Sequence, residues 1–154
     1  MNTATLNTIL SNHRNRPGAL LPILHEIQDT FGHVPEDAVP LIARELNLSR
    51  AEIHGVITYY HHFRQRPAGQ HVIRVCRAEA CQAVGSEALL EHAQSRLGCG
   101  LHETTADGCI TLEPVFCLGQ CAIGPAVMID ENELRGRVTA ANFDTITEAL
   151  RGKK

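Results

Sequence analysis

Two pairs of closely spaced cysteines constrain this chain more than any other feature of its sequence. Cys76 and Cys81 bound the segment "CRAEAC", and Cys117 and Cys121 bound "CLGQC", so the spacings are C-x4-C and C-x3-C. Four thiolates that meet at one place repel one another strongly unless a cation compensates their charge. If the fold brings the two pairs together, the sequence therefore predicts a metal ion or an iron-sulfur cluster.

Composition restricts the setting in which these thiols act. The 154 residues are 44% hydrophobic and include 14 basic and 17 acidic side chains, which argues against disorder and against a nucleic-acid binder that neutralises phosphates. The N-terminal segment lacks a signal-peptide pattern, and no run of about 18 apolar residues predicts a membrane span. We therefore expect a soluble, cytoplasmic protein without nucleic-acid partners or membrane insertion. Its cysteines are not expected to form structural disulfides.

Hydrophobic periodicity divides the chain near Pro67. Residues 1–66 predict a small three-helix domain, and residues 67–154 predict an α/β domain that begins at the linker "RQRPAGQ". The apolar positions of the three helices lie within 20–31, 39–46 and 53–60. The last helix is preceded by a capping box of Ser49 and Glu52. No titratable groups converge on these helices, so packing is their expected role.

The second domain alternates strands with helices. The expected elements are a strand at 71–76, a helix at 85–98, strands at 111–117, 126–130 and 134–138, and a helix at 141–152. The tight turn "DENE" joins the last two strands. This order predicts a small α/β sandwich in which helices pack on a mixed sheet.

The cysteine pairs fall where strands of this domain end. Cys76 and Cys117 close strands, and Cys81 and Cys121 lie in the loops that follow. A 2Fe-2S cluster needs two thiolates for each iron, which two loop pairs can supply. Structural zinc with four cysteine ligands is the competing interpretation, although its pairs commonly enclose two residues. A thioredoxin-type dithiol is disfavoured because the chain has no C-x-x-C.

Other reactive side chains have simpler interpretations. Cys99 and Cys109 lack a spaced partner and are expected to be buried apolar residues. His61 and His62 of "YYHHF" have no nearby cysteine, unlike Rieske ligands, and are expected to end the third helix. The sequence shows no nucleophile-base pair, phosphate-binding glycine loop or nicotinamide fingerprint. We therefore predict no catalytic residue and no NAD binding by this chain alone.

The segments around the cysteines resemble a known family. "VCRAEACQAVG" and "EPVFCLGQCAIGPAVMID" resemble the thioredoxin-like 2Fe-2S family that includes the 24 kDa subunit of respiratory complex I, and within it the gamma subunits of soluble NAD-dependent formate dehydrogenases. "HGVITYYHHF" is similar to the helical N-terminal region of that family, so the resemblance covers nearly the whole chain. It implies a thioredoxin-like fold for residues 67–154 and one 2Fe-2S cluster. The implied ligands are Cys76, Cys81, Cys117 and Cys121.

The resemblance also implies partner subunits. A pterin-bearing alpha-type subunit with molybdenum or tungsten would oxidise formate. A flavin-bearing beta-type subunit with FMN and further iron-sulfur clusters would reduce NAD+. This chain would be a non-catalytic electron-transfer subunit, with residues 1–66 as an additional docking surface. The equivalent subunit of complex I or of an NAD-linked hydrogenase is the alternative, and a zinc-stabilised interaction module is a third interpretation.

Residues next to the implied ligands give two further expectations. We expect the amides of residues 118–121, and the side chain of Arg77, to tune the potential of the cluster. Gly124 stands where many members of the family that this chain resembles have Ala or Ser. We expect this difference to change the stiffness of the loop but not the ligation.

Overall fold

The structure, a computed structural model, describes residues 2–152 of the chain. It comprises two compact units that divide between Pro67 and Ala68. Each unit has its own core of buried aliphatic side chains. No helix among the described residues is long and apolar enough to cross a membrane.

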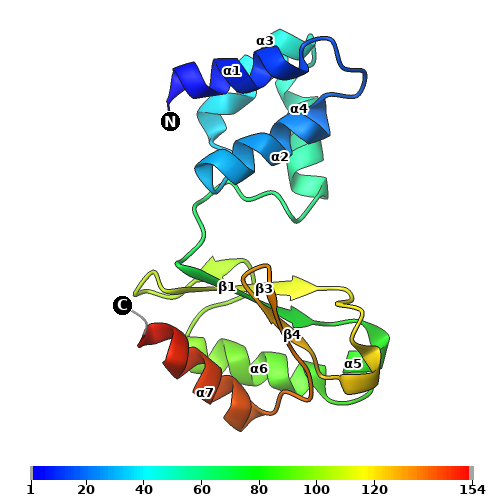
Figure 1. The fold of residues 1–154 in the computed structure, drawn as a ribbon, viewed down its shortest axis with the longest axis vertical. Helices are drawn as coiled ribbons and strands as arrows, with labels where there is room; N and C mark the ends of the chain where they lie inside the picture. Colours follow the sequence, from blue (N-terminus) through cyan, green and yellow to red (C-terminus); the bar gives the residue numbers. More distant parts are fainter. Residues whose placement is uncertain (1, 153–154) are drawn as a thin grey trace. The chain divides into compact units, whose positions relative to one another are not determined.

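The first unit is built from α-helices (Figure 1). They are α1 (Thr3–His13), α2 (Leu20–Phe31), α3 (Val39–Leu46) and α4 (Arg50–Tyr59), with the 3-10 helix η1 (Glu36–Ala38) before α3. The prediction of three helices within residues 1–66 was wrong, because it missed α1. The sequence of α1 is mostly Thr, Asn and Ser, so its apolar periodicity is weak. Asn2 caps this helix by accepting a hydrogen bond from the Ala4 amide at 3.0 Å.

Aliphatic side chains from all four helices form the core of this unit. Its fully buried members include Leu6, Ile23, Leu24, Ile27, Ile42 and Ile53. The predicted capping box precedes α4: the Glu52 amide donates to Ser49 Oγ at 3.1 Å, and the Ser49 amide donates to Glu52 Oε2 at 2.7 Å. Gln28 of α2 holds the segment after α4. Its Nε2 donates to the His62 carbonyl at 2.8 Å, and its Oε1 accepts from the Arg64 amide at 2.7 Å.

The second unit contains a five-stranded mixed sheet. Its strands are β1 (His71–Cys76), β2 (Glu103–Thr104), β3 (Ile110–Val115), β4 (Val127–Ile129) and β5 (Glu133–Arg135), and its helices are α5 (Glu79–Gln82), α6 (Ser86–Leu97), η2 (Cys121–Ile123) and α7 (Ala140–Arg151). The strand order is β2-β3-β1-β4-β5, with β1 and β3 parallel and the other neighbours antiparallel. The mixed sheet and the antiparallel pair at "DENE" are confirmed. The short elements β2 and α5 were not predicted.

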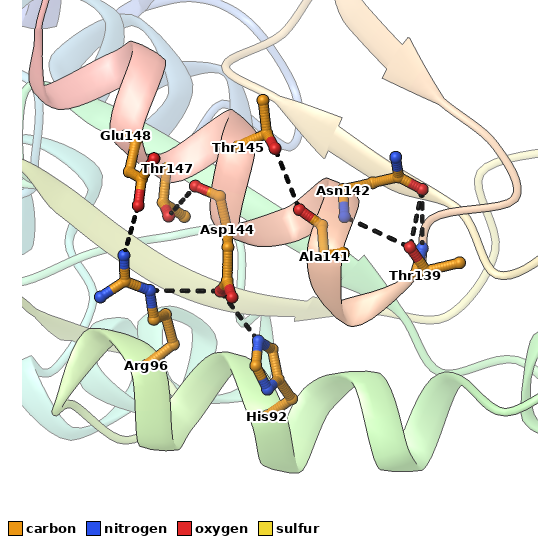
Figure 2. A network of polar contacts seen from close by, with 9 residues as sticks. All are labelled: His92, Arg96, Thr139, Ala141, Asn142, Asp144, Thr145, Thr147 and Glu148. Carbon is orange, nitrogen blue, oxygen red and sulfur yellow. Dashed lines mark hydrogen bonds and ion pairs between the residues drawn. The ribbon is translucent and has the colours of Figure 1, made fainter.

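α6 and α7 lie on one face of this sheet (Figure 1), and the core fills the space between. Its members include Ile73, Val75, Ile110 and Leu112 from the strands and Leu89, Leu90, Ala93 and Phe143 from the helices. Polar contacts also join the two helices (Figure 2). His92 Nε2 lies 2.8 Å from Asp144 Oδ1, and Arg96 donates to Asp144 at 3.2 Å and to Glu148 at 2.9 Å. α6 and α7 therefore contact each other as well as the sheet.

The crossover from β1 through α6 to β3 determines where the cysteine pairs lie. Because β1 and β3 are parallel, their carboxyl ends share one edge of the sheet, with Cys76 in register with Val115. In the chain, α6 comes between β1 and β3 and runs back along the sheet. Its first residue therefore lies at the edge where β1 ends. The segments that follow β1 and β3 therefore leave the sheet next to each other.

Candidate metal centre

Cys76 and Cys81, the buried pair, lie at the carboxyl end of β1. Cys76 is the last residue of the strand, and its amide donates to the Ala126 carbonyl at 3.0 Å. Cys81 lies in the one-turn helix α5 rather than in the predicted loop, and its amide donates to the Ala78 carbonyl at 2.9 Å. Both cysteines are 2% exposed and pack with Ala126 in a small apolar cluster. These two thiols are thus shielded from water.

Cys117 and Cys121, the exposed pair, lie in the segment after β3. That strand ends at Val115, two residues earlier than predicted, and Cys121 begins η2 instead of lying in a loop. The two sulfurs are 3.9 Å apart, and both residues are exposed. Cys117 has a φ of 135°, and Gly119 a φ of 73°, so the backbone turns sharply here. This turn directs the Gly119 amide to Cys117 Sγ at 3.3 Å.

Electrostatic interactions connect the two pairs. Burial raises the pKa of Cys81, and the hydrogen bond to Cys76 and the charges of Cys76 and Cys121 raise it further. The hydrogen bond to Cys117 and the charge of that thiol raise the pKa of Cys121, with a smaller contribution from Cys76. The structure therefore brings all four predicted cysteines together at one edge of the sheet. Their mutual repulsion as thiolates is the cost that a bound cation would offset.

The donor set fits a 2Fe-2S cluster. The sulfurs are grouped as two pairs, and a 2Fe-2S cluster takes two thiolates on each iron. Within residues 2–152, no three or more Cys, His, Asp or Glu side chains are placed to hold a single metal ion. The pairs come from the two segments that leave parallel strands, so rigid elements hold both.

Gly124 keeps space free beside the buried pair. A Cβ at this position would lie 3.2 Å from Cys81 Sγ and 2.9 Å from Val84 Cγ2. Its φ of −62° is open to any residue, so this clearance and not the backbone conformation favours glycine. The peptide bond to Pro125 is cis. The expectation that Gly124 changes the stiffness of the loop but not the ligation stays a prediction, and the structure places this residue beside the sulfur of Cys81.

Arg77, which directly follows Cys76, is held by a carboxylate at the start of α6. The Arg77 guanidinium, which was expected to tune the site, makes a bidentate pair with the Glu87 carboxylate, with both N–O distances at 3.1 Å. That carboxylate offsets the charge of Arg77. Ser86 is fully buried, and its Oγ has no hydrogen-bond partner in the described structure.

The remaining cysteines and the conspicuous histidines lie elsewhere. Cys99 and Cys109 belong to the core between the sheet and its helices, as predicted, and burial raises the pKa of Cys99. His61 and His62 belong to the helical unit. They follow α4, which ends at Tyr59, so the expectation that they end the helix was wrong. The His62 ring lies 5.2 Å from that of His25.

A mixed sheet with two helices on one face and two cysteine pairs where parallel strands end is the arrangement of an iron-sulfur protein. The chain belongs to the Thioredoxin-like [2Fe-2S] ferredoxin family, which it matches over residues 6–151. The cofactor of this family is a 2Fe-2S cluster. The fold predicted for the second unit is thereby confirmed.

Named relatives are subunits of oxidoreductases. The chain is 38% identical over 123 residues to a subunit of the NADH-quinone oxidoreductase of Pseudomonas aeruginosa, and the match covers 80% of this chain and 74% of the relative. It is 30% identical over 131 residues to the NADP-reducing hydrogenase subunit HndA of Solidesulfovibrio fructosivorans, a match that covers 85% and 76%. The crystal structure of an air-oxidised NAD+-reducing [NiFe]-hydrogenase shares the fold, with a TM-score of 0.70 and 23% identity. That match covers 91% of this chain and 24% of the hydrogenase chain.

Proposed function

We propose that this chain is an electron-transfer subunit that holds one 2Fe-2S cluster and exchanges electrons with a flavin-bearing, NAD-binding subunit. The proposed ligands are Cys76, Cys81, Cys117 and Cys121. The observation that carries the proposal is the meeting of a buried and an exposed thiol pair at one edge of the sheet. When bound, the cluster supplies a site that accepts and returns single electrons.

The residues of the chain hold this site and set its surroundings. The buried pair lies in an apolar cluster with Ala126, which excludes water on the inner side. On the outer side, the Gly119 amide points at Cys117 Sγ and stabilises negative charge on that sulfur. Hydrogen bonds to ligand sulfurs and exposure to solvent set the potential of such a cofactor. We assign no catalytic residue to the chain.

Exposed apolar side chains beside the ligands support a protein partner at this edge. Phe116 directly precedes Cys117 and is 66% exposed, and Val84, beside Gly124, is 53% exposed. Large apolar side chains at a redox-active edge are unfavourable in water and are covered when another protein docks there. The proposed occupant is the flavin-bearing subunit, because a carrier without a substrate site needs an adjacent redox centre.

The finer proposal is that the chain is the gamma subunit of an NAD-dependent formate dehydrogenase in the cytoplasm. The resemblance of "CRAEACQ" and "PAVMID" to such subunits supports it. An alpha-type subunit with a molybdenum or tungsten pterin would oxidise formate, and FMN and further clusters would lie on partner chains. The second candidate is the equivalent subunit of NADH-quinone oxidoreductase or of an NAD(P)-linked hydrogenase. The names of the relatives favour that candidate.

Metal analysis of the purified chain tests the cluster. We expect about two iron atoms and about two acid-labile sulfides per chain. Replacing any proposed ligand by alanine, for example Cys117→Ala, should abolish stable cluster binding. Cys99→Ala and Cys109→Ala are matched controls and should retain it. One zinc per chain without sulfide would instead identify a zinc-stabilised module.

Co-purification tests the partners. The chain is tagged in its native cells and isolated anaerobically with the proteins that bind it, and NAD+ reduction by formate is then assayed. We expect activity together with flavin-bearing and pterin-bearing subunits. Hydrogen-dependent NAD(P)+ reduction or quinone-linked NADH oxidation, without formate activity, would assign the chain to the second candidate.

A further inference from the structure

β5 is an edge strand with a neighbour on one side only in the described sheet. The strand order is β2-β3-β1-β4-β5, and β5 (Glu133–Arg135) pairs with β4 alone. The backbone groups on its outer side are therefore available to a strand from another chain. Its middle residue, Leu134, is 44% exposed. Pairing at this edge would cover that leucine.

The charges along this edge have opposite signs on the two sides of Leu134. In the segment "ENELRGR" (131–137), two glutamates precede the leucine and two arginines follow it. Glu133 and Arg135 lie within β5, and Glu131 and Arg137 repeat the pattern just outside the strand. When two identical strands pair antiparallel across a two-fold axis, residues at equal distances before and after the axis lie opposite each other. With Leu134 at the axis, each glutamate of one copy would therefore lie opposite an arginine of the other.

Other arrangements of two such strands are less favourable. Parallel pairing in register would place Glu133 opposite Glu133 and Arg135 opposite Arg135, and like charges directly opposite each other destabilise a sheet. Short, charged edge strands commonly prevent association for this reason. In this segment the same charges are complementary for one orientation only, which is the antiparallel pairing with a second copy.

Hydrogen bonds hold both ends of this segment in place. At the acidic end, the Val72 amide donates to Asp130 Oδ1 at 2.9 Å, and the Asp130 amide donates to the Val72 carbonyl at 2.8 Å. At the basic end, the Arg137 amide donates to the Ile123 carbonyl at 2.6 Å. The edge is thus already ordered in the single chain, so pairing would cost little conformational entropy.

The surroundings of β5 leave room for an added strand. Glu133 and Arg135 line a groove of about 440 Å³, together with residues of α7 such as Ile146. Leu134 lies on the opposite face of the sheet, in register with Met128 of β4. In the single chain, Glu133 and Arg135 form an ion pair with each other. A second copy would exchange this pair for equivalent pairs across the interface, while two leucines become covered.

We propose that β5 pairs with β5 of a second copy of this chain, antiparallel about Leu134, so that two five-stranded sheets become continuous. Backbone hydrogen bonds and the covered leucines provide the affinity, and the charges determine orientation and register. The interface is isologous, because both copies contribute the same edge. None of the proposed ligands belongs to β5, so the inference does not depend on the cluster.

The test measures the oligomeric state of charge-reversal variants by sedimentation equilibrium. The full-length proteins are purified anaerobically, and the wild type should have the mass of two chains. Glu133→Arg and Arg135→Glu each place like charges opposite one another in the proposed pairing, so each should have the mass of one chain. Mixed in equal amounts, these two variants should form a heterodimer, because the arginines of one then face the glutamates of the other. Glu91→Arg and Arg16→Glu make the same charge changes at exposed positions elsewhere and should remain dimeric.

A further variant tests the axis itself. Leu134→Asp places two carboxylates opposite each other and should also be monomeric. Far-ultraviolet circular dichroism spectra equal to the wild type show that each variant is folded. A monomeric wild type, or a dimer that persists in both single charge reversals, would overturn the inference. Two folded, monomeric variants that fail to associate on mixing would do the same. If the reversals instead remove a different protein that co-purifies with a monomeric wild type, the edge binds that protein and the inference is wrong.

Discussion

Gly124 shows how a single residue can protect a ligand without binding the cofactor. Its missing Cβ leaves Cys81 Sγ unobstructed, because an added carbon would lie 3.2 Å from that sulfur. The closer neighbour, Val84 Cγ2, belongs to an exposed side chain that can rotate away. The sulfur has no such freedom, since Cys81 is buried in α5. The absence of a Cβ at Gly124 therefore leaves room for the sulfur of Cys81.

We predict that Gly124→Ala perturbs the cluster through Cys81. Overpacking a buried site costs about 1–3 kcal/mol, and here the strain falls on a ligand. The expected result is faster release of iron to a chelator and an altered visible circular dichroism spectrum. Gly55→Ala is the control, because a Cβ at Gly55 meets no atom within 4 Å. Identical iron release from both variants and the wild type would refute the prediction.

At the scale of residues, the sequence predicted where the four cysteines lie in the fold but not their surroundings. Their spacings grouped them as two pairs, and the apolar pattern before each pair placed the pairs where two strands end. The contact between Gly124 and Cys81 joins two segments that are far apart in the chain. No local pattern encodes such a contact, so the sequence indicated that Gly124 is unusual but not which ligand it adjoins.

At the scale of elements, α4 begins with a capping box that includes a charged side chain. The Glu52 carboxylate accepts a hydrogen bond from the Ser49 amide, and this bond is the largest cause of a lowered Glu52 pKa. Because the folded pKa lies below the unfolded value, the charged carboxylate contributes stability above the unfolded pKa. That contribution is lost as the pH falls through the folded pKa.

We predict a pH-dependent difference in stability between wild type and Glu52→Gln. The wild type should be the more stable protein at neutral pH, and the difference should shrink on acidification below about 4.5, the ordinary value for this group. Urea unfolding followed by circular dichroism at several pH values measures it. Asp29→Asn, an exposed substitution on α2, is the control for the removal of one negative charge. A difference that grew toward acid pH would contradict the assigned role of the charge.

Prediction from sequence succeeded for elements with a clear period and failed for the others. α6 and α7 were predicted to within a residue or two because each turn contributes apolar residues to the core. β2 has two residues and α5 has four, so neither is long enough to show a repeat. α1 is long enough, but its apolar positions lie among polar residues. Its place in the helical core is decided by packing rather than by propensity.

On the scale of the whole molecule, we propose that the helical unit adds a second docking surface to the one beside the ligands. Each unit has its own core, and all four proposed ligands lie in the second unit. The helical unit exposes Tyr59 and Tyr60, which are 76% and 44% exposed and line a groove with Leu48 and Val56. Paired exposed tyrosines are typical of protein interfaces, because they combine apolar area with a polar group. This surface is the proposed docking site of the helical unit.

We predict that deletion of residues 1–66 releases the chain from its complex while the cluster is retained. The iron and sulfide contents should stay near the wild-type values, and co-purification of the flavin-bearing subunit should be lost. A double variant, Tyr59→Ser with Tyr60→Ser, should weaken co-purification without removing the core of the unit. Loss of the cluster with unchanged co-purification would show that the roles of the two units are assigned incorrectly.

Because the two thiol pairs differ in exposure, the chain would protect its cofactor unequally on the two sides until a partner docks. One side of the site is sealed by the protein, and the other opens to solvent through Cys117 and Cys121. Oxidants and chelators can therefore reach an unassembled chain from one direction only. The partner that docks on this edge would close that route. Assembly would then determine how long the cofactor survives in air as well as where its electrons go.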